Sequence, residues 1–133
     1  MTNANFKVIY EKLTSIIPVD WEKLIYRADY GQDSWSMIFY VVQGNEVIKD
    51  CYSLKGVSRG ELIKLFSELN AKLEASQDVE GWHVMTMTIA RNGTFKTDFV
   101  YEDISENLAE YYKDWERKYL FHDGQLCIRP DFL

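Results

Sequence analysis

The stretch Trp82 to Tyr101, WHVMTMTIARNGTFKTDFVY, decides how the rest of the chain is interpreted. Two apolar runs flank the dipeptide Asn92-Gly93, which favours a β-hairpin because a type I′ turn needs a positive φ at both central residues. With this dipeptide as the turn, Thr86 faces Phe99 across the hairpin. One face then carries Trp82, Val84, Thr86, Thr88, Ala90, Phe95, Thr97, Phe99 and Tyr101. The other face carries His83, Met85, Met87, Ile89, Lys96, Asp98 and Val100.

Further secondary structure is expected before this hairpin, because two strands alone are only marginally stable in water. Apolar residues at helical spacing predict a helix from Asn3 to Ile17, which ends where Pro18 disfavours the helical conformation of the preceding residue. Three strands with short connections are predicted next, over residues 21–30, 34–42 and 46–54.

Two more helices complete the pattern. Ser58 and Glu61 form a capping box that predicts a helix from Val57 to Leu73. Asp103 and Glu106 have the same spacing and predict a cap for a last helix from 104 to 119. The resulting order is α-βββ-α-ββ-α. Because helices and strands are segregated, we predict one α+β domain over residues 1–133, with an antiparallel sheet (a meander plus a hairpin) covered by three helices.

Charge and cysteine usage narrow the classes of function. The net charge is −6, which disfavours direct binding to nucleic acid because phosphates must be neutralised by Lys and Arg. Neither a signal peptide nor an apolar run near twenty residues occurs, so we expect a cytoplasmic protein without membrane contact. Cys51 and Cys127 lack metal-type spacing and are expected to be unpaired, reduced thiols.

Catalytic motifs are absent from the sequence. There is no P-loop, GxGxxG, GxSxG, HExxH or CxxC, so we expect no enzyme activity, cofactor or metal. His83 is expected to be a hydrogen-bonded strand histidine rather than a general base. The remaining enzymatic hypothesis is a nucleophile set made of His122, Asp123 and Cys127, which is weak because these residues lie in an irregular tail.

The segment from Asp98 to Glu116 is strongly acidic. It contains seven acids and one base, Lys113. Glu106, Glu110 and Asp114 recur every four residues and therefore share one face of the last helix. Two interpretations stay open: a solvated face with acids favourable near the helix N-terminus, or an anionic surface that docks on a basic partner.

The hairpin and the segment after it resemble the signature of YezG-like immunity proteins. In that family a tryptophan-led strand and a glycine-containing turn precede a Phe-x-x-Asp-Phe-x-Tyr-Glu/Asp strand and the last helix. The matching positions are Trp82, Gly93, Phe95, Asp98, Phe99, Tyr101, Glu102 and Asp103. The first helix, the meander with DYGQDSWSMIFYV and the capped middle helix are also similar, so the resemblance covers nearly the whole chain.

The resemblance implies a cytoplasmic antitoxin of a Gram-positive bacterium. Such proteins bind a cognate toxin, often a nuclease exported by type VII secretion, and perform no reaction themselves. The expected partner is therefore a toxin with a basic nuclease domain. The expected partner-binding residues, each of which also has a structural interpretation, are Asp98, Tyr101, Glu102, Asp103, Glu106 and Glu110, followed by Trp35 and Asp33. The alternative is a non-catalytic adaptor or chaperone-like module for a secreted partner.

Overall fold

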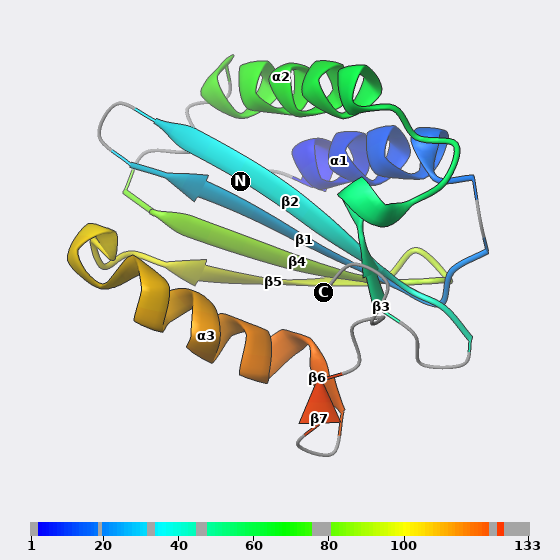
Figure 1. The fold of residues 1–133 in the computed structure, drawn as a ribbon. Helices are drawn as coiled ribbons and strands as arrows, with labels where there is room; N and C mark the ends of the chain where they lie inside the picture. Colours follow the sequence, from blue (N-terminus) through cyan, green and yellow to red (C-terminus); the bar gives the residue numbers. More distant parts are fainter. Residues whose placement is uncertain are drawn as a thin grey trace.

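The computed structural model describes residues 3–18, 20–31, 34–44, 48–75, 81–122 and 125–126. It contains a five-stranded antiparallel sheet with the strand order β3-β2-β1-β4-β5. Helices α1 (Asn3–Ile16) and α2 (Arg59–Ala75) cover one face of this sheet, and α3 (Leu108–Tyr119) covers the other (Figure 1). The predicted α+β fold and its order of elements are confirmed.

Strand β1 (Lys23–Tyr30) lies at the centre, between β2 (Trp35–Val42) and β4 (Val84–Ala90). Because side chains alternate along a strand, β1 contributes residues to the cores on both faces of the sheet. Leu24, Tyr26 and Ala28 are buried in the main core beneath α1 and α2. Ile25 packs with Trp115 of α3 in a second, smaller core. The α3 face of β1 also carries Arg27 and Asp29, so a charged pair lies inside an otherwise apolar layer.

The third predicted strand is shorter than expected. Strand β3 spans only Ile48–Asp50 and is followed by a 3-10 helix over Cys51–Ser53. Asp50 Oδ1 accepts hydrogen bonds from the backbone N–H groups of Tyr52 and Ser53, at 2.9 and 3.0 Å. This side chain offers the backbone an alternative to the sheet ladder, which ends the strand.

The predicted capping box of α2 is confirmed. The backbone N–H of Glu61 donates to Ser58 Oγ at 3.1 Å, and the backbone N–H of Ser58 donates to Glu61 Oε1 at 3.2 Å. Both amides would otherwise have no partner within the helix, so the box fixes where α2 begins.

The predicted register of the hairpin is wrong by one residue. Thr86 of β4 lies opposite Asp98 of β5 (Phe95–Val100), not opposite Phe99. The backbone N–H of Ala90 donates to the oxygen of Thr94, and Gly93 has a φ of 88°. This geometry is that of a three-residue loop ending in a left-handed glycine rather than a two-residue turn. Because side chains alternate between the two faces of a strand, this slip of one residue moves every side chain of β5 to the opposite face of the sheet from the one predicted relative to β4.

The last predicted helix begins later than expected. Residues Ser105–Asn107 form a 3-10 turn, and α3 starts at Leu108. Asp103 Oδ1 accepts from the backbone N–H of Ser105 at 3.0 Å, and neither N-cap residue of the two helices has a side-chain cap. The predicted reciprocal cap of Asp103 and Glu106 is therefore wrong. After α3, β6 (Phe121–His122) and β7 (Gln125–Leu126) form a separate two-stranded sheet.

Candidate functional site

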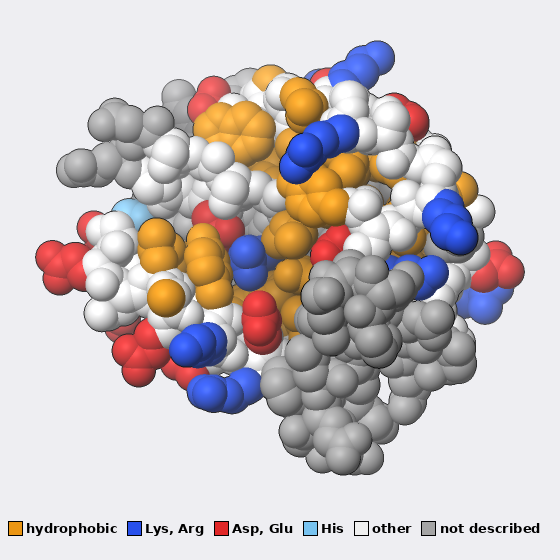
Figure 2. All heavy atoms as spheres, in the orientation of Figure 1, with side chains coloured by type: hydrophobic (Ala, Val, Ile, Leu, Met, Phe, Trp, Pro, Cys, Tyr) orange, Lys and Arg blue, Asp and Glu red, His pale blue; other side chains and the backbone are white. Residues whose placement is uncertain are grey.

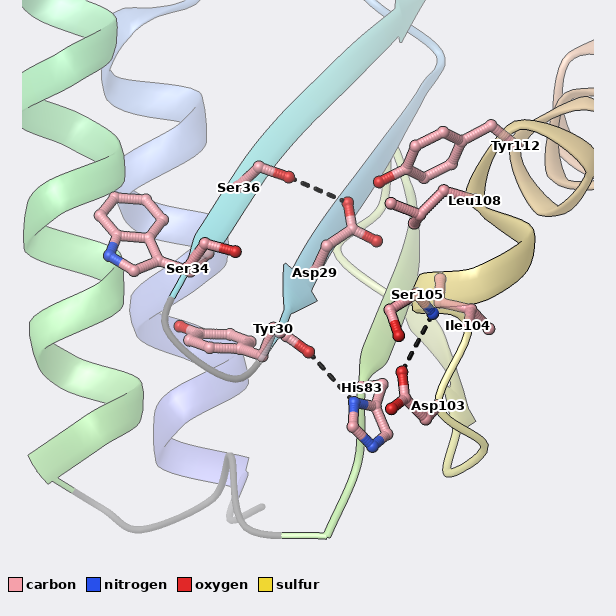
Figure 3. Close-up of a pocket in the computed structure, with 12 residues that line it drawn as sticks. Asp29, Tyr30, Ser34, Ser36, His83, Asp103, Ile104, Ser105, Leu108 and Tyr112 are labelled. Carbon is pink, nitrogen blue, oxygen red and sulfur yellow. Dashed lines mark hydrogen bonds between the residues drawn. The ribbon is translucent and has the colours of Figure 1, made fainter.

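A cleft of about 480 Å³ opens where β1 ends, β2 begins and α3 starts (Figure 3). We call it the Asp29 cleft. Three segments that are far apart in the sequence meet there: the β1–β2 connection, the residue that precedes β4, and the beginning of α3. Its walls are formed by Asp29, Tyr30, Gly31, Ser34, Trp35, Ser36, His83, Asp103, Ile104, Ser105, Leu108 and Tyr112.

Asp29 is the deepest charged group of the cleft, with only 8% of the residue exposed. Its Oδ2 accepts from Arg27 Nε at 3.0 Å and from Ser36 Oγ at 3.3 Å. Its Oδ1 is buried and accepts no hydrogen bond from the described part of the chain. Burial raises the pKa of the Asp29 carboxyl, although the Arg27 charge acts in the opposite direction.

Arg27 is held between the sheet and α3. Its guanidinium carbon lies 4.4 Å from the ring centre of Tyr112 and 4.5 Å from that of Trp115. These contacts combine ring stacking and cation–π attraction, for which the planar guanidinium is well suited. The Arg27 side chain therefore ties α3 to β1, and its only hydrogen bond to Asp29 goes to Oδ2.

His83 lies at the opposite wall and is hydrogen-bonded, as predicted. Its Nδ1–H donates to the backbone oxygen of Tyr30 at 3.1 Å, and backbone bonds link His83 to Tyr30 and Val100. Beside it (Figure 3), hydrogen bonds from the amide and hydroxyl of Ser105 lower the pKa of the Asp103 carboxyl. Asp103 is exposed and stays ionised at neutral pH.

The predicted partner-binding residues do not all lie at one site. Trp35 and Asp103 both line the Asp29 cleft, and Trp35 is 38% exposed. Trp35 lies opposite Tyr30 in the strand ladder, so its ring is on the face of the sheet that α1 and α2 cover. Tyr101 and Glu102 precede Asp103 directly and are exposed, with 65% of Tyr101 accessible. Asp33 lies outside the described residues. The hypothesised set of His122, Asp123 and Cys127 likewise falls outside them, except for the backbone of His122.

Asp98 has a structural role that its predicted face did not suggest. Its Oδ2 accepts from the Tyr119 hydroxyl at 2.6 Å, which links β5 to the end of α3. Burial, followed by this hydrogen bond, raises the pKa of Tyr119. The bond is possible because the observed register turns Asp98 toward α3.

The predicted acidic face of the last helix is exposed, but basic side chains lie next to some of its acids. Glu106 and Glu110 are exposed, and Asp114 pairs with Arg117 at 3.0 Å. Glu110 lines a shallow hollow together with Lys113 and Arg117. The exposed acidic side chains are therefore most concentrated before the start of the helix, around Glu102, Asp103 and Glu106.

Sequence reasoning missed Asp29 as a site residue. A signal was present, since Arg27 and Asp29 stand two residues apart in the strand and therefore share one face of it. Opposite charges on one face of a mostly buried strand indicate a specific partner inside the protein or a binding site.

No metal centre is evident: groups of three or more His, Cys, Asp or Glu suited to a metal ion do not occur within the described ranges. None of the helices in those ranges combines the length and apolar character needed to cross a membrane.

Comparison with known proteins gives a consistent result. A family model described as "Immunity protein YezG-like" matches residues 3–132. The immunity protein YezG of Bacillus subtilis (strain 168) is 32% identical over 137 aligned positions, covering 95% of this chain and 88% of that protein. The match spans the sheet, all three helices and the Asp29 cleft. The chain therefore belongs to the family of YezG-like immunity proteins.

Proposed function

We propose that this protein is an antitoxin that binds a secreted toxin, most simply a nuclease exported by type VII secretion, and neutralises it in the cytoplasm. Membership of an immunity-protein family supports a toxin as the partner. The observation that carries the proposal is the exposed surface at the start of α3. Acidic side chains lie at the left edge of Figure 2. The surface comprises Tyr101, Glu102, Asp103 and Glu106, and Trp35 lines the adjoining Asp29 cleft.

The chemistry of this surface suits a nuclease. An enzyme that cleaves nucleic acid presents Lys and Arg to phosphates, and carboxylates of an inhibitor can occupy the same positions. Exposed Trp and Tyr rings supply large, rigid contact areas of the kind that dominate binding energy at interfaces. Inhibition then follows from occupation of the toxin surface and needs no reaction by the antitoxin. Glu110 extends the proposed surface, whereas Asp98 supports it by holding α3 through Tyr119.

Co-expression tests this function. A candidate toxin domain, sought among the neighbouring genes, is expressed in a bacterial host with and without this protein, and growth is followed at equal toxin levels. We expect growth arrest by the toxin alone and recovery when both are present. Binding of the two proteins without recovery of growth would support the adaptor function instead. Growth arrest that persists with abundant folded protein and no complex would contradict both functions.

A further inference from the structure

One oxygen of Asp29 has a hydrogen-bonding capacity that the described chain does not use. Asp29 points from β1 toward Leu108 and Tyr112 (Figure 3). Its Oδ2 accepts hydrogen bonds from Arg27 and Ser36, whereas Oδ1 is buried and has no partner among the described residues. A buried acceptor without a donor is unfavourable and rare in folded proteins. The unused oxygen therefore has the capacity to accept from a donor beyond the described residues.

The cleft has the charge and shape for a cationic donor. Asp29 and Asp103 line it, while Lys and Arg are absent among its described lining residues. Ile104 and Leu108 provide an apolar wall, and Tyr112 provides an aromatic ring. An arginine side chain matches this combination, because its aliphatic stem suits an apolar wall and its guanidinium both stacks on rings and donates to carboxylates.

We propose that the Asp29 cleft receives one arginine side chain of the toxin, whose guanidinium donates to Asp29 Oδ1. This inference rests on the proposed function and names the chemistry of its interface. The Leu108 side chain lies near the Asp29 carboxylate in Figure 3 and is 41% exposed, so we expect a change of its rotamer to give access to Oδ1. Burial of Asp29 favours a second cation, since an additional positive charge offsets the desolvation that raises its pKa.

A lysine built into the cleft tests this assignment. Leu108→Lys places an internal cation beside Asp29 and should compete with the toxin's arginine. Ile63→Lys is the matched control, because Ile63 is an exposed apolar residue on α2, on the other side of the sheet. With folding verified by circular dichroism, we expect the dissociation constant for the toxin domain to rise at least tenfold in L108K and to stay within twofold in I63K. Equal affinities of L108K and I63K would overturn the proposal.

A small probe tests the cleft without any toxin. N-acetyl-arginine methylamide and its uncharged citrulline analogue are titrated against the isotope-labelled full chain by NMR. We expect the arginine probe alone to shift the amide signals of Ser36, Ser105 and Leu108, and expect Asp29→Asn to abolish the shifts. Identical responses to both probes would overturn the proposal. Arginine-specific shifts in a protein that fails to neutralise toxin would overturn the proposed function and leave the cleft assignment standing.

Discussion

The indole Nε1–H of Trp115 donates a hydrogen bond of 2.9 Å to Thr86 Oγ1. This bond joins α3 to β4 across the smaller core, where Trp115 is 3% exposed. Tyr119 makes a second link through Asp98, and Arg27 makes a third through its contacts with the rings of α3. Together they fix the middle and the end of α3 on the sheet. Because the helix is continuous, this also positions its beginning, which forms the outer wall of the Asp29 cleft.

The Trp115–Thr86 bond should contribute measurably to stability. Trp115→Phe removes the donor and some volume, so we expect the free energy of unfolding in urea to fall by about 1–3 kcal/mol. Thr86→Val leaves the indole N–H buried without an acceptor and should cost about 1–3 kcal/mol. The double variant should lose less than the sum of the two. Strictly additive losses would show that the two side chains do not interact.

Replacement of Gly93 in the hairpin loop should lower the stability of the protein. Its φ of 88° lies in the left-handed region, where a side chain costs about 1–2 kcal/mol. We expect Gly93→Ala to lower the midpoint of thermal unfolding. Gly60→Ala is the control. Gly60 lies in α2, where an added Cβ would have Ser58 Oγ as its neighbour at 3.9 Å. This substitution should stabilise the protein by about 0.5–1 kcal/mol. An unchanged or raised midpoint in Gly93→Ala would refute the loop geometry.

The same loop shows where sequence reasoning reached its limit. Asn92-Gly93 correctly indicated a hairpin, but the dipeptide occurs in both two-residue and three-residue loops. The choice depends on Asn92 Oδ1, which accepts from the backbone N–H and the hydroxyl of Thr94, at 3.0 and 2.7 Å. These local bonds are invisible in an apolar/polar pattern, and the resulting slip decides that Asp98 faces α3.

Features formed by residues close together in the sequence were predicted better than features formed by distant segments. The Ser58–Glu61 box and the apolar stripes of the helices are local features, and the structure confirms them. The Asp29 cleft depends on segments around residues 29, 83 and 105 coming together. No local pattern encodes that meeting, so Trp35 and Asp103 were predicted separately and Asp29 was missed.

Stability should fall in alkaline solution. Burial raises the pKa of Cys51 to about 12, and it also raises the pKa values of Tyr40 and Tyr111 to about 12. In the unfolded chain these groups ionise near pH 8.5 for Cys and about 10 for Tyr. The unfolded state therefore loses protons first, and stability present below pH 8.5 is lost as the pH rises toward 12.

The contribution of Cys51 to this loss can be isolated. Each such group lowers the free energy of unfolding by up to about 1.4 kcal/mol per pH unit between its two pKa values. Urea unfolding at pH 8, 9 and 10 should therefore show a smaller decline in Cys51→Ala than in the parent protein. Parallel declines in the two proteins would mean that the thiol of Cys51 is not protected from ionisation by folding.

The acidic surface should accelerate association with the toxin. Reversing Glu106 and Glu110 to lysine changes the net charge from −6 to −2, and we expect the association rate at low salt to fall about tenfold, with a smaller effect at high salt. Glu11→Lys with Glu22→Lys makes the same change on exposed residues of α1 and of the segment before β1. Equal slowing by both pairs would assign the effect to net charge rather than to this surface.

The most direct test of neutralisation by binding is a titration of toxin activity. A fixed amount of the purified toxin domain receives increasing amounts of this protein, and the rate of nucleic-acid cleavage is measured at two incubation times. Inhibition by binding predicts a linear loss of activity that ends at a fixed molar ratio and is the same at both times. A progressive loss of toxin activity at amounts of this protein far below that ratio would contradict it, because such a loss requires turnover.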